Sequence, residues 1–240
     1  MNKEEVENNI LGKYPSFIER LKNLIDLCLS KVQVISNQKP DWITNNDARY
    51  AIYGKYVSVL NATRISIYNT LHFINQKDWV ETYNSEFSIG GQTNNFVYLK
   101  ELDTQLRFAN YMSFVSNFES SLKIIIRFLK QKKERCASSY ASFVIDNLKI
   151  KTHDDFLRMV KHLRNTIHNN GIHIPDNSIY NNDHINFKGL DFNFQRNKRV
   201  ELQWTDCFNI YEEIINLTEQ IIKEDIVAMH KLIKDIVVES

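Results

Sequence analysis

The sequence predicts a mainly α-helical (all-α) fold, a bundle of long helices with one small β-hairpin. Only six Gly and three Pro occur in 240 residues, too few for the turns of a many-stranded β protein. Apolar side chains recur at three- and four-residue steps over long stretches, which is the period of amphipathic helices. Alternation of apolar and polar residues is confined to residues 185–204, where it predicts the hairpin.

The first part of the chain, residues 1–95, is expected to form an N-terminal helical region that packs on the bundle. Apolar residues at helical spacing predict a first helix over residues 15–35. The polar stretch 37–46 interrupts it, and a second long helix is expected over residues 47–75. Residues 85–95, which contain two adjacent glycines, predict a loop.

The second part, residues 96–240, is expected to form the bundle itself. Its longest helical pattern covers residues 97–130 and predicts a central core helix, which a shorter helix over residues 138–148 follows. The next helix is expected to begin at Thr152, because Thr152 and Asp155 have the spacing of a capping box.

That helix should end near residues 169–171, Asn-Asn-Gly, which can adopt the left-handed conformation that terminates helices. In the hairpin near residues 185–204, the polar residues Arg196–Arg199 are expected to form the turn. A last helix over residues 205–237, with Thr205 or Asp206 as its cap, closes the chain.

Composition and charge exclude several classes of protein. A formal charge of +1 gives no global attraction to a polyanion, so a nucleic-acid site would need a local basic patch. Cys28, Cys136 and Cys207 are odd in number and widely separated, which predicts reduced thiols and neither a disulfide framework nor a zinc site. The N-terminus lacks the apolar core of a signal peptide, and no apolar run reaches membrane-spanning length. These features predict a cytoplasmic protein that does not enter a membrane.

The residues best suited to chemistry lie at 163–171, Leu-Arg-Asn-Thr-Ile-His-Asn-Asn-Gly. Arg164 and His168 are four residues apart, so a continuous helix places them on one face, where both can contact one ligand. Arginine can hold a phosphate with two parallel hydrogen bonds, and histidine can give or take a proton near neutral pH. Together they could cleave a phosphodiester without a metal ion.

This stretch resembles the signature of the HEPN superfamily, helical-bundle domains that include many RNA-cleaving toxins and defence proteins. Members carry an Arg, usually followed by a polar residue such as the Asn at 165, a short distance before a His near a helix end. The segment 118–122, Phe-Glu-Ser-Ser-Leu, resembles the polar position on the partner helix of such domains. The resemblance covers about residues 97–238, and residues 1–95 match no family.

The sequence departs from the family pattern in spacing. Family members usually place a longer stretch between Arg and His than Asn165, Thr166 and Ile167, and the next histidine, His173, leaves eight residues between it and Arg164.

The resemblance implies a metal-independent endoribonuclease without a cofactor, acting as a homodimer whose two Arg/His sets face one cleft. His168 would deprotonate the ribose 2′-hydroxyl or protonate the leaving oxygen, and Arg164 would stabilise the charge of the phosphorane. Asn165 would orient the phosphate or His168, and Glu119 would hold Arg164. A toxin or defence setting, with RNA as substrate and a protein antitoxin or regulator as partner, is a further implication.

The same residues also have a structural interpretation. Arg164 and His168 would each stabilise a helix by about 0.3–1 kcal/mol by meeting the negative end of its dipole. Asn170 and Gly171 would serve as a C-cap, and Glu119 would accept a hydrogen bond from a buried donor. The alternative function is therefore a non-catalytic HEPN-like binding or scaffold protein.

Two basic clusters are candidates for contacts with RNA phosphates, although solvated surface charges are the alternative explanation for both. The clusters are Lys130, Lys132 and Lys133 with Arg135, and Arg196, Lys198 and Arg199. The histidines of residues 153–184 lack the spacing of metal ligands, so no metal site is expected.

Overall fold

The computed structural model describes residues 11–74, 95–175 and 182–235. Its named helices and strands are α2 (Tyr14–Gln38), α3 (Pro40–Thr44), α4 (Ala48–Ile74), α6 (Asn95–Gln131), α7 (Tyr140–Ser142), α8 (Asp154–His168), β1 (Asn182–Phe187), β2 (Leu190–Gln195), α9 (Trp204–Lys223) and α10 (Asp225–Ala228). Single turns of 3-10 or π-helix at Leu11–Lys13, Phe143–Asn147 and Lys151–His153 adjoin α2, α7 and α8. The prediction of a mainly helical fold with one hairpin is confirmed.

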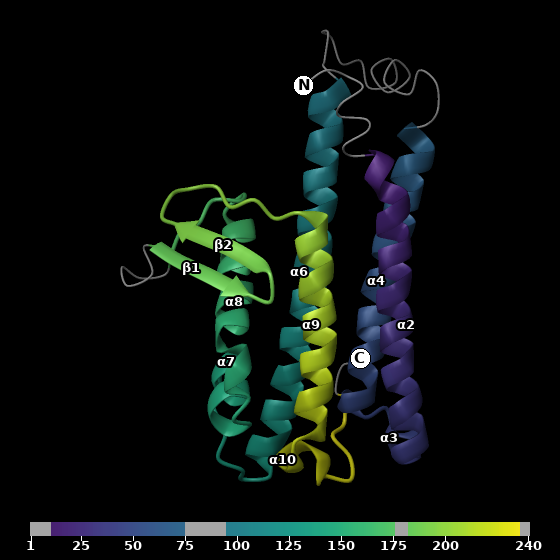
Figure 1. Ribbon diagram of the computed structural model, residues 1–240. Helices are drawn as coiled ribbons and strands as arrows, with labels where there is room; N and C mark the ends of the chain where they lie inside the picture. The colour runs from purple at the N-terminus through teal and green to yellow at the C-terminus, as the bar shows by residue number, and fades with distance from the viewer. Residues whose placement is uncertain (1–10, 75–94, 176–181, 236–240) are drawn as a thin grey trace.

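Four long helices, α2, α4, α6 and α9, lie side by side, and α7, α8 and the hairpin cover the far side of α6 (Figure 1). Helix α2 packs on α4 and α9, α4 packs on α6, and α8 packs on α6 and on β1. The site described below lies at the upper end of α8 in Figure 1, where α8, α6 and the segment after β2 meet.

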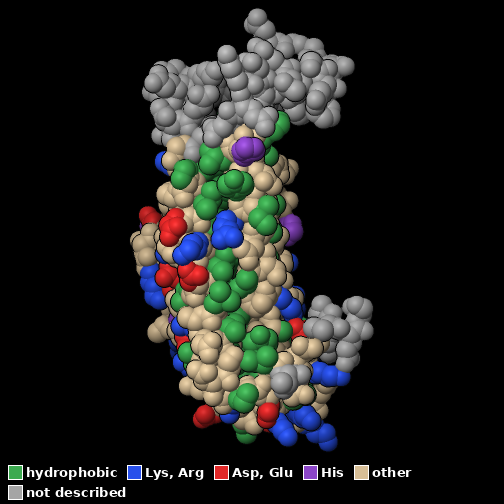
Figure 2. Space-filling model, turned by 90° about the vertical axis from the view of Figure 1, so that its right-hand side faces the viewer, with side chains coloured by type: hydrophobic (Ala, Val, Ile, Leu, Met, Phe, Trp, Pro, Cys, Tyr) green, Lys and Arg blue, Asp and Glu red, His purple; other side chains and the backbone are tan. Residues whose placement is uncertain are grey.

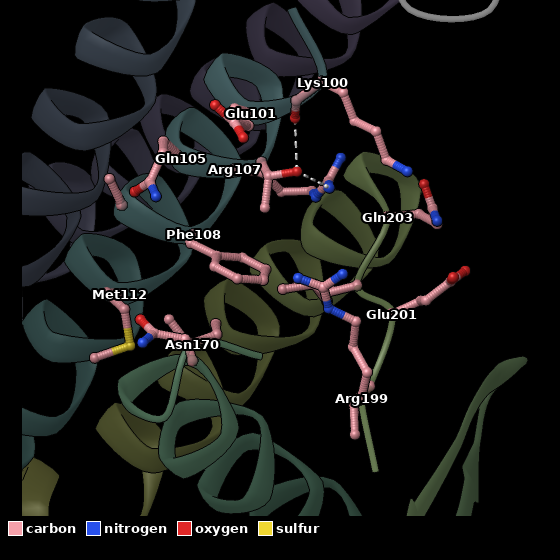
Figure 3. A pocket seen from close by; sticks show the side chains of 15 residues that line it. Lys100, Glu101, Gln105, Arg107, Phe108, Met112, Asn170, Arg199, Glu201 and Gln203 are labelled. Atoms are coloured by element: carbon pink, nitrogen blue, oxygen red, sulfur yellow. Dashed lines mark hydrogen bonds between the residues drawn. The ribbon is translucent and has the colours of Figure 1, made fainter. Parts of the chain in front are cut away.

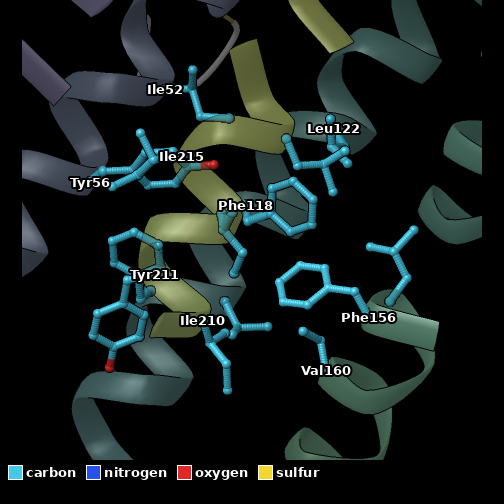
Figure 4. Close-up of a cluster of buried hydrophobic side chains, with 14 of the residues drawn as sticks. Ile52, Tyr56, Phe118, Leu122, Phe156, Val160, Ile210, Tyr211 and Ile215 are labelled. Atoms are coloured by element: carbon cyan, nitrogen blue, oxygen red, sulfur yellow. The ribbon is translucent and has the colours of Figure 1, made fainter. Parts of the chain in front are cut away.

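One continuous apolar core joins these helices. Phe118 of α6 and Phe156 of α8 face each other across it (Figure 4), and the rings of Tyr56, Phe114 and Tyr211 stack with centroid distances of 4.7 and 4.2 Å. This stack crosses α4, α6 and α9, so the N-terminal helices share the core of the predicted bundle. The predicted division of the chain near residue 95 stays a prediction.

The predicted helices over residues 15–35, 47–75 and 97–130 are confirmed as α2, α4 and α6. The interruption at 37–46 also contains a short helix, α3, that was not predicted. Most of the loop predicted at 85–95 lies outside the described residues.

The predicted hairpin turn was wrong. Strands β1 and β2 pair antiparallel with Phe187 opposite Leu190, so the turn is Lys188-Gly189, with φ angles of +48° and +82°. The alternation of apolar residues changes phase between Phe187 and Leu190, which are three residues apart, and this phase change marks the turn. Arg196–Arg199 instead form a second turn, after β2, that returns the chain toward α8.

The predicted length of the last helix was also wrong. Helix α9 ends at Lys223, because Glu224 is extended (ψ 135°), and the chain continues through the short α10 without a further helix in residues 229–235. Tertiary contacts hold this segment: Arg49 Nη1 donates to the carbonyl oxygens of Val227 and His230, at 2.7 and 2.9 Å.

Two predicted helix starts were wrong as well. Gln203 caps α9 through a capping box with Asp206, because the Asp206 carboxylate accepts from the Gln203 amide. Helix α8 begins after His153 without a side-chain cap, and the Thr152 hydroxyl lies 3.1 Å from Nδ1 of His153. The predicted helix over 138–148 is α7 followed by one π-helical turn.

Among the described helices, none combines the length and apolar character that crossing a membrane requires. Figure 2 shows the face at the right-hand side of Figure 1, where apolar side chains form a stripe between charged ones. The exposed apolar side chains of α2 and α4 are Leu29, Val34, Ile65, Tyr68 and Phe73.

Candidate functional site

The structure brings Arg164 and Glu119 together between α8 and α6. Arg164 Nη1 lies 2.7 Å from Glu119 Oε2, and the arginine side chain is 35% exposed whereas the glutamate side chain is 4% exposed. The apolar stripe of α8, which includes Val160 and Leu163, packs against the core and leaves Arg164 at the edge of the interface with α6. A buried carboxylate therefore pairs with a partly exposed arginine side chain.

This ion pair leaves polar atoms without partners. Within the described part of the chain, Glu119 Oε1 and Arg164 Nε are buried and have no hydrogen-bond partner. Tyr140 lies beside the pair: burial raises the pKa of its hydroxyl, and the Glu119 carboxylate raises it further. Glu119 is thus a buried carboxylate whose ion-pair partner among the described residues is Arg164.

His168 is the last residue of α8 and is exposed. It lies one helical turn beyond Arg164, a spacing at which two side chains share one side of a helix. Its side chain makes no hydrogen bond or ion pair with another described residue, so its ring is open to a ligand. Asn165 is half-buried, and its carbonyl oxygen accepts a hydrogen bond of 2.8 Å from the Asn169 side chain.

The end of α8 has the predicted left-handed termination. Asn170 and Gly171 have φ angles of +55° and +86°, and the Gly171 amide donates to the carbonyl oxygen of Thr166 at 2.9 Å. A Cβ on Gly171 would lie 3.7 Å from the Phe108 ring and 3.8 Å from Arg199 Nε. The predicted stop at residues 169–171 is confirmed.

One of the two basic clusters lies beside this helix end. The His173 amide donates to the Lys198 carbonyl and the Val200 amide donates to the Gly171 carbonyl, at 2.9 and 3.0 Å. This short antiparallel contact brings Arg196, Lys198 and Arg199, all exposed, next to the turn that follows His168.

The other basic cluster lies at the opposite end of α6. Lys130 is eleven residues beyond Glu119, which corresponds to about 16 Å along a helix. Its Nζ donates to Ser138 Oγ at 2.6 Å, and Lys132 Nζ lies 5.5 Å from the Phe128 ring centroid. The structure therefore does not place Lys130, Lys132 and Lys133 at the site.

A histidine cluster beneath the site was not predicted from the sequence. His173 is fully buried, with Nδ1 3.4 Å from Thr166 Oγ1, and its Nε2 has no partner among the described residues. Its ring centroid lies 5.2 Å from that of His162, whose Nε2 lies 3.1 Å from Asp183. Burial lowers the pKa of His162. His173 therefore lies in the core and not beside Arg164 on the surface.

A groove of about 1000 Å³ opens next to the same helix end and was also missed from the sequence (Figure 3). It is formed by the first half of α6, the end of α8 and the segment that joins β2 to α9. Ile167 and Asn170 belong to both the groove and the surroundings of His168. No sequence pattern indicates the groove, because three separate segments form it.

Elsewhere in the described ranges, no three His, Cys, Asp or Glu side chains gather in the arrangement of a metal site. Compared with known proteins, the chain matches no protein-family model, no curated protein and no solved structure.

Proposed function

We propose that this chain is a metal-independent endoribonuclease of HEPN type, with a role as a toxin or defence protein. The observation that carries the proposal is the Glu119–Arg164 pair, whose partly exposed arginine side chain lies one helical turn from the exposed side chain of His168. A fixed cation beside an imidazole, which can give or take a proton, suits phosphodiester cleavage.

Each residue has a defined role in this reaction. His168 takes the proton of a ribose 2′-hydroxyl, whose oxygen attacks the adjacent phosphorus, and the bond from phosphorus to the 5′ oxygen breaks. Arg164 stabilises the negative charge of the phosphorane, and Glu119 fixes the guanidinium. Asn165, three residues before His168, orients His168 or the phosphate. The products are a 2′,3′-cyclic phosphate and a 5′-hydroxyl end.

The leaving 5′ oxygen needs a proton while His168 of the same copy is acting as the base. A second copy facing the first would supply it, so the proposal includes a homodimer across this helix end. Ile172 and Ile174, which follow the helix end, are 40% and 47% exposed and provide an apolar surface for this contact. The exposed apolar side chains of α2 and α4 lie on the other side of the bundle (Figures 1 and 2).

Arg196, Lys198 and Arg199 border the same helix end and would hold phosphates on either side of the cleaved bond. Such contacts give affinity that does not depend on RNA sequence. The opposing structural interpretation is that Arg164 serves only to neutralise buried Glu119, which leaves a non-catalytic binding or scaffold domain.

The test is cleavage of single-stranded RNA in the presence of a chelator by the full chain and by His168→Ala and Arg164→Lys variants. His184→Ala and Arg127→Ala are matched controls, because both residues are exposed and lie outside the site. The proposal predicts cyclic phosphate ends from the wild-type chain, a rate reduction of about 10²–10⁴-fold for His168→Ala, and no change for the controls. Absence of cleavage, or equal cleavage by all variants, would favour the scaffold.

A further inference from the structure

The groove beside His168 has a floor and a rim of different chemistry. Its floor is apolar and includes Phe108 and Met112 of α6 and Ile167 of α8. Figure 3 shows the ring of Phe108 directed into the groove, with the guanidinium of Arg199 across from it. A half-buried aromatic ring that faces an open groove can stack with a flat ligand.

The rim carries three cations, Lys100, Arg107 and Arg199, together with amides and two carboxylates, Glu101 and Glu201. Arg107 is held in place because its Nη1 donates to Asp103 Oδ2 at 2.5 Å, and Asp103 Oδ1 also accepts from Trp204 Nε1 at 2.8 Å. Lys100 and Arg199 are exposed on the two walls of the groove. The three cations suit phosphate oxygens. The amide side chains of Gln105, Asn170 and Gln203 suit the hydrogen-bonding edge of a base.

The position of the groove relates it to the Arg164–His168 site. Ile167 precedes His168 directly, and the groove extends along α6 away from Glu119 as far as Lys100. Phe108 is eleven residues before Glu119, about 16 Å along the helix axis, so a strand bound at His168 would reach the Phe108 ring within a few nucleotides.

We infer that this groove binds the single-stranded RNA next to the cleaved bond, with one base stacked on Phe108 and its phosphates held by Arg107 and Arg199. The identity of the ligand rests on the proposed ribonuclease function. Duplex RNA fits poorly, because its bases are paired and stacked on one another and cannot turn onto an aromatic side chain. The groove therefore selects for unpaired RNA.

The test uses the full chain with His168→Ala, so that the probe stays intact, and a fluorescein-labelled single-stranded 12-nucleotide RNA in a fluorescence anisotropy titration. Adding Phe108→Leu should weaken binding about 5- to 100-fold, the range expected for loss of one base–aromatic stack. Phe108→Trp should preserve affinity. Phe128→Leu, the same change at a partly buried Phe near the far end of α6, should leave the affinity unchanged.

A cross-linking measurement tests the inference even if the Phe108→Leu variant does not fold correctly, because it uses the His168→Ala parent. RNA that contains 4-thiouridine should cross-link, in the His168→Ala parent, to peptides from residues 100–112 or 199–203. Cross-links elsewhere, equal affinity of the Phe108→Leu variant and its parent, or no binding of the probe would overturn the inference. Loss of cleavage alone would not: a wild-type chain that binds RNA through Phe108 without cutting it refutes the catalytic proposal and retains the groove.

Discussion

Two arginine–carboxylate pairs in this protein have opposite surroundings. Asp47 and Arg49 are both fully buried, and every nitrogen of the guanidinium donates: Nε and Nη2 to Asp47, and Nη1 to two carbonyl oxygens of the C-terminal segment. The guanidinium also lies 3.6 Å from the ring centroid of Trp42. Arg164 and Glu119 share one contact, with the arginine side chain 35% exposed and one oxygen of the carboxylate unpaired.

The difference separates a structural pair from a pair that can bind a ligand. At Asp47–Arg49 every nitrogen of the guanidinium already donates to a protein oxygen, and the backbone amide of Ile233 donates to Asp47 Oδ2 at 2.8 Å. At Glu119–Arg164 the carboxylate pairs with one nitrogen of the guanidinium, and the arginine side chain is partly exposed to solvent. The first pair explains why the chain folds back after α10, and the second pair lies where the proposed reaction takes place.

The largest expected effect follows from breaking the buried pair. Arg49→Ala should lower the free energy of unfolding by about 3–5 kcal/mol, because it leaves the Asp47 carboxylate buried and uncompensated. Urea unfolding measures the loss, with exposed Arg127→Ala as the control. A loss as small as that of the control would show that the corner at α3, α4 and α10 does not depend on this pair.

A smaller loss is expected at the half-exposed pair. Arg164→Ala should lower the free energy of unfolding by about 1–3 kcal/mol, since it removes a charged hydrogen bond to buried Glu119. Adding Glu119→Gln should recover part of that loss by removing the uncompensated charge. The double-mutant cycle measures the coupling, and strictly additive losses would contradict the account of Glu119 as the partner that holds Arg164.

The helices and the hairpin show which features of the fold could be predicted from the sequence and which could not. Periodicity along one helix indicated α2, α4, α6 and α8, and the Asn-Asn-Gly run indicated where α8 ends, because both signals are local. The path of the chain after α9 depends on contacts with Arg49, which is far away in the sequence. Helical periodicity alone therefore predicted a last helix that is longer than α9. The hairpin turn could have been found from the three-residue step between Phe187 and Leu190.

The candidate site shows the same limit: contacts between distant segments could not be predicted from the sequence. Arg164 and His168 are four residues apart, so their placement on one side of a helix was predictable from the sequence. The groove was not, because Phe108 follows the apolar pattern of a core residue and its neighbours come from segments far apart in the chain. His173 resembled a surface candidate in the sequence, but the turn after α8 directs it into the core.

The core beneath the end of α8 also makes the stability of the protein depend on pH. Burial lowers the pKa of His162, near the end of α8, below its ordinary value of 6.5. The unfolded chain then binds more protons than the folded one as the pH falls below 6.5, so this contribution to stability is present above pH 6.5 and is lost through the folded pKa. His162→Gln should flatten the dependence of unfolding free energy on pH in this range. An unaltered slope in the His162→Gln variant would refute this role.

The smallest expected effect concerns the basic clusters. Lys198→Ala, next to the end of α8, should reduce the salt dependence of RNA binding by about one unit of slope in a plot of log affinity against log salt. Lys132→Ala, at the far end of α6, should leave this slope unchanged. Equal slopes for the two variants would mean that bound RNA does not contact the basic surface beside His168.

The most direct test of the central claim compares Arg49→Lys with Arg164→Lys in the same two assays, RNA cleavage and urea unfolding. Both changes keep the charge but remove the planar, bidentate geometry of arginine. The account predicts that Arg49→Lys loses stability while the folded protein cleaves RNA at the wild-type rate, and that Arg164→Lys loses cleavage with little change in stability. Equal behaviour of the two variants, or unimpaired cleavage by Arg164→Lys, would contradict the assignment of one pair to the fold and the other to catalysis.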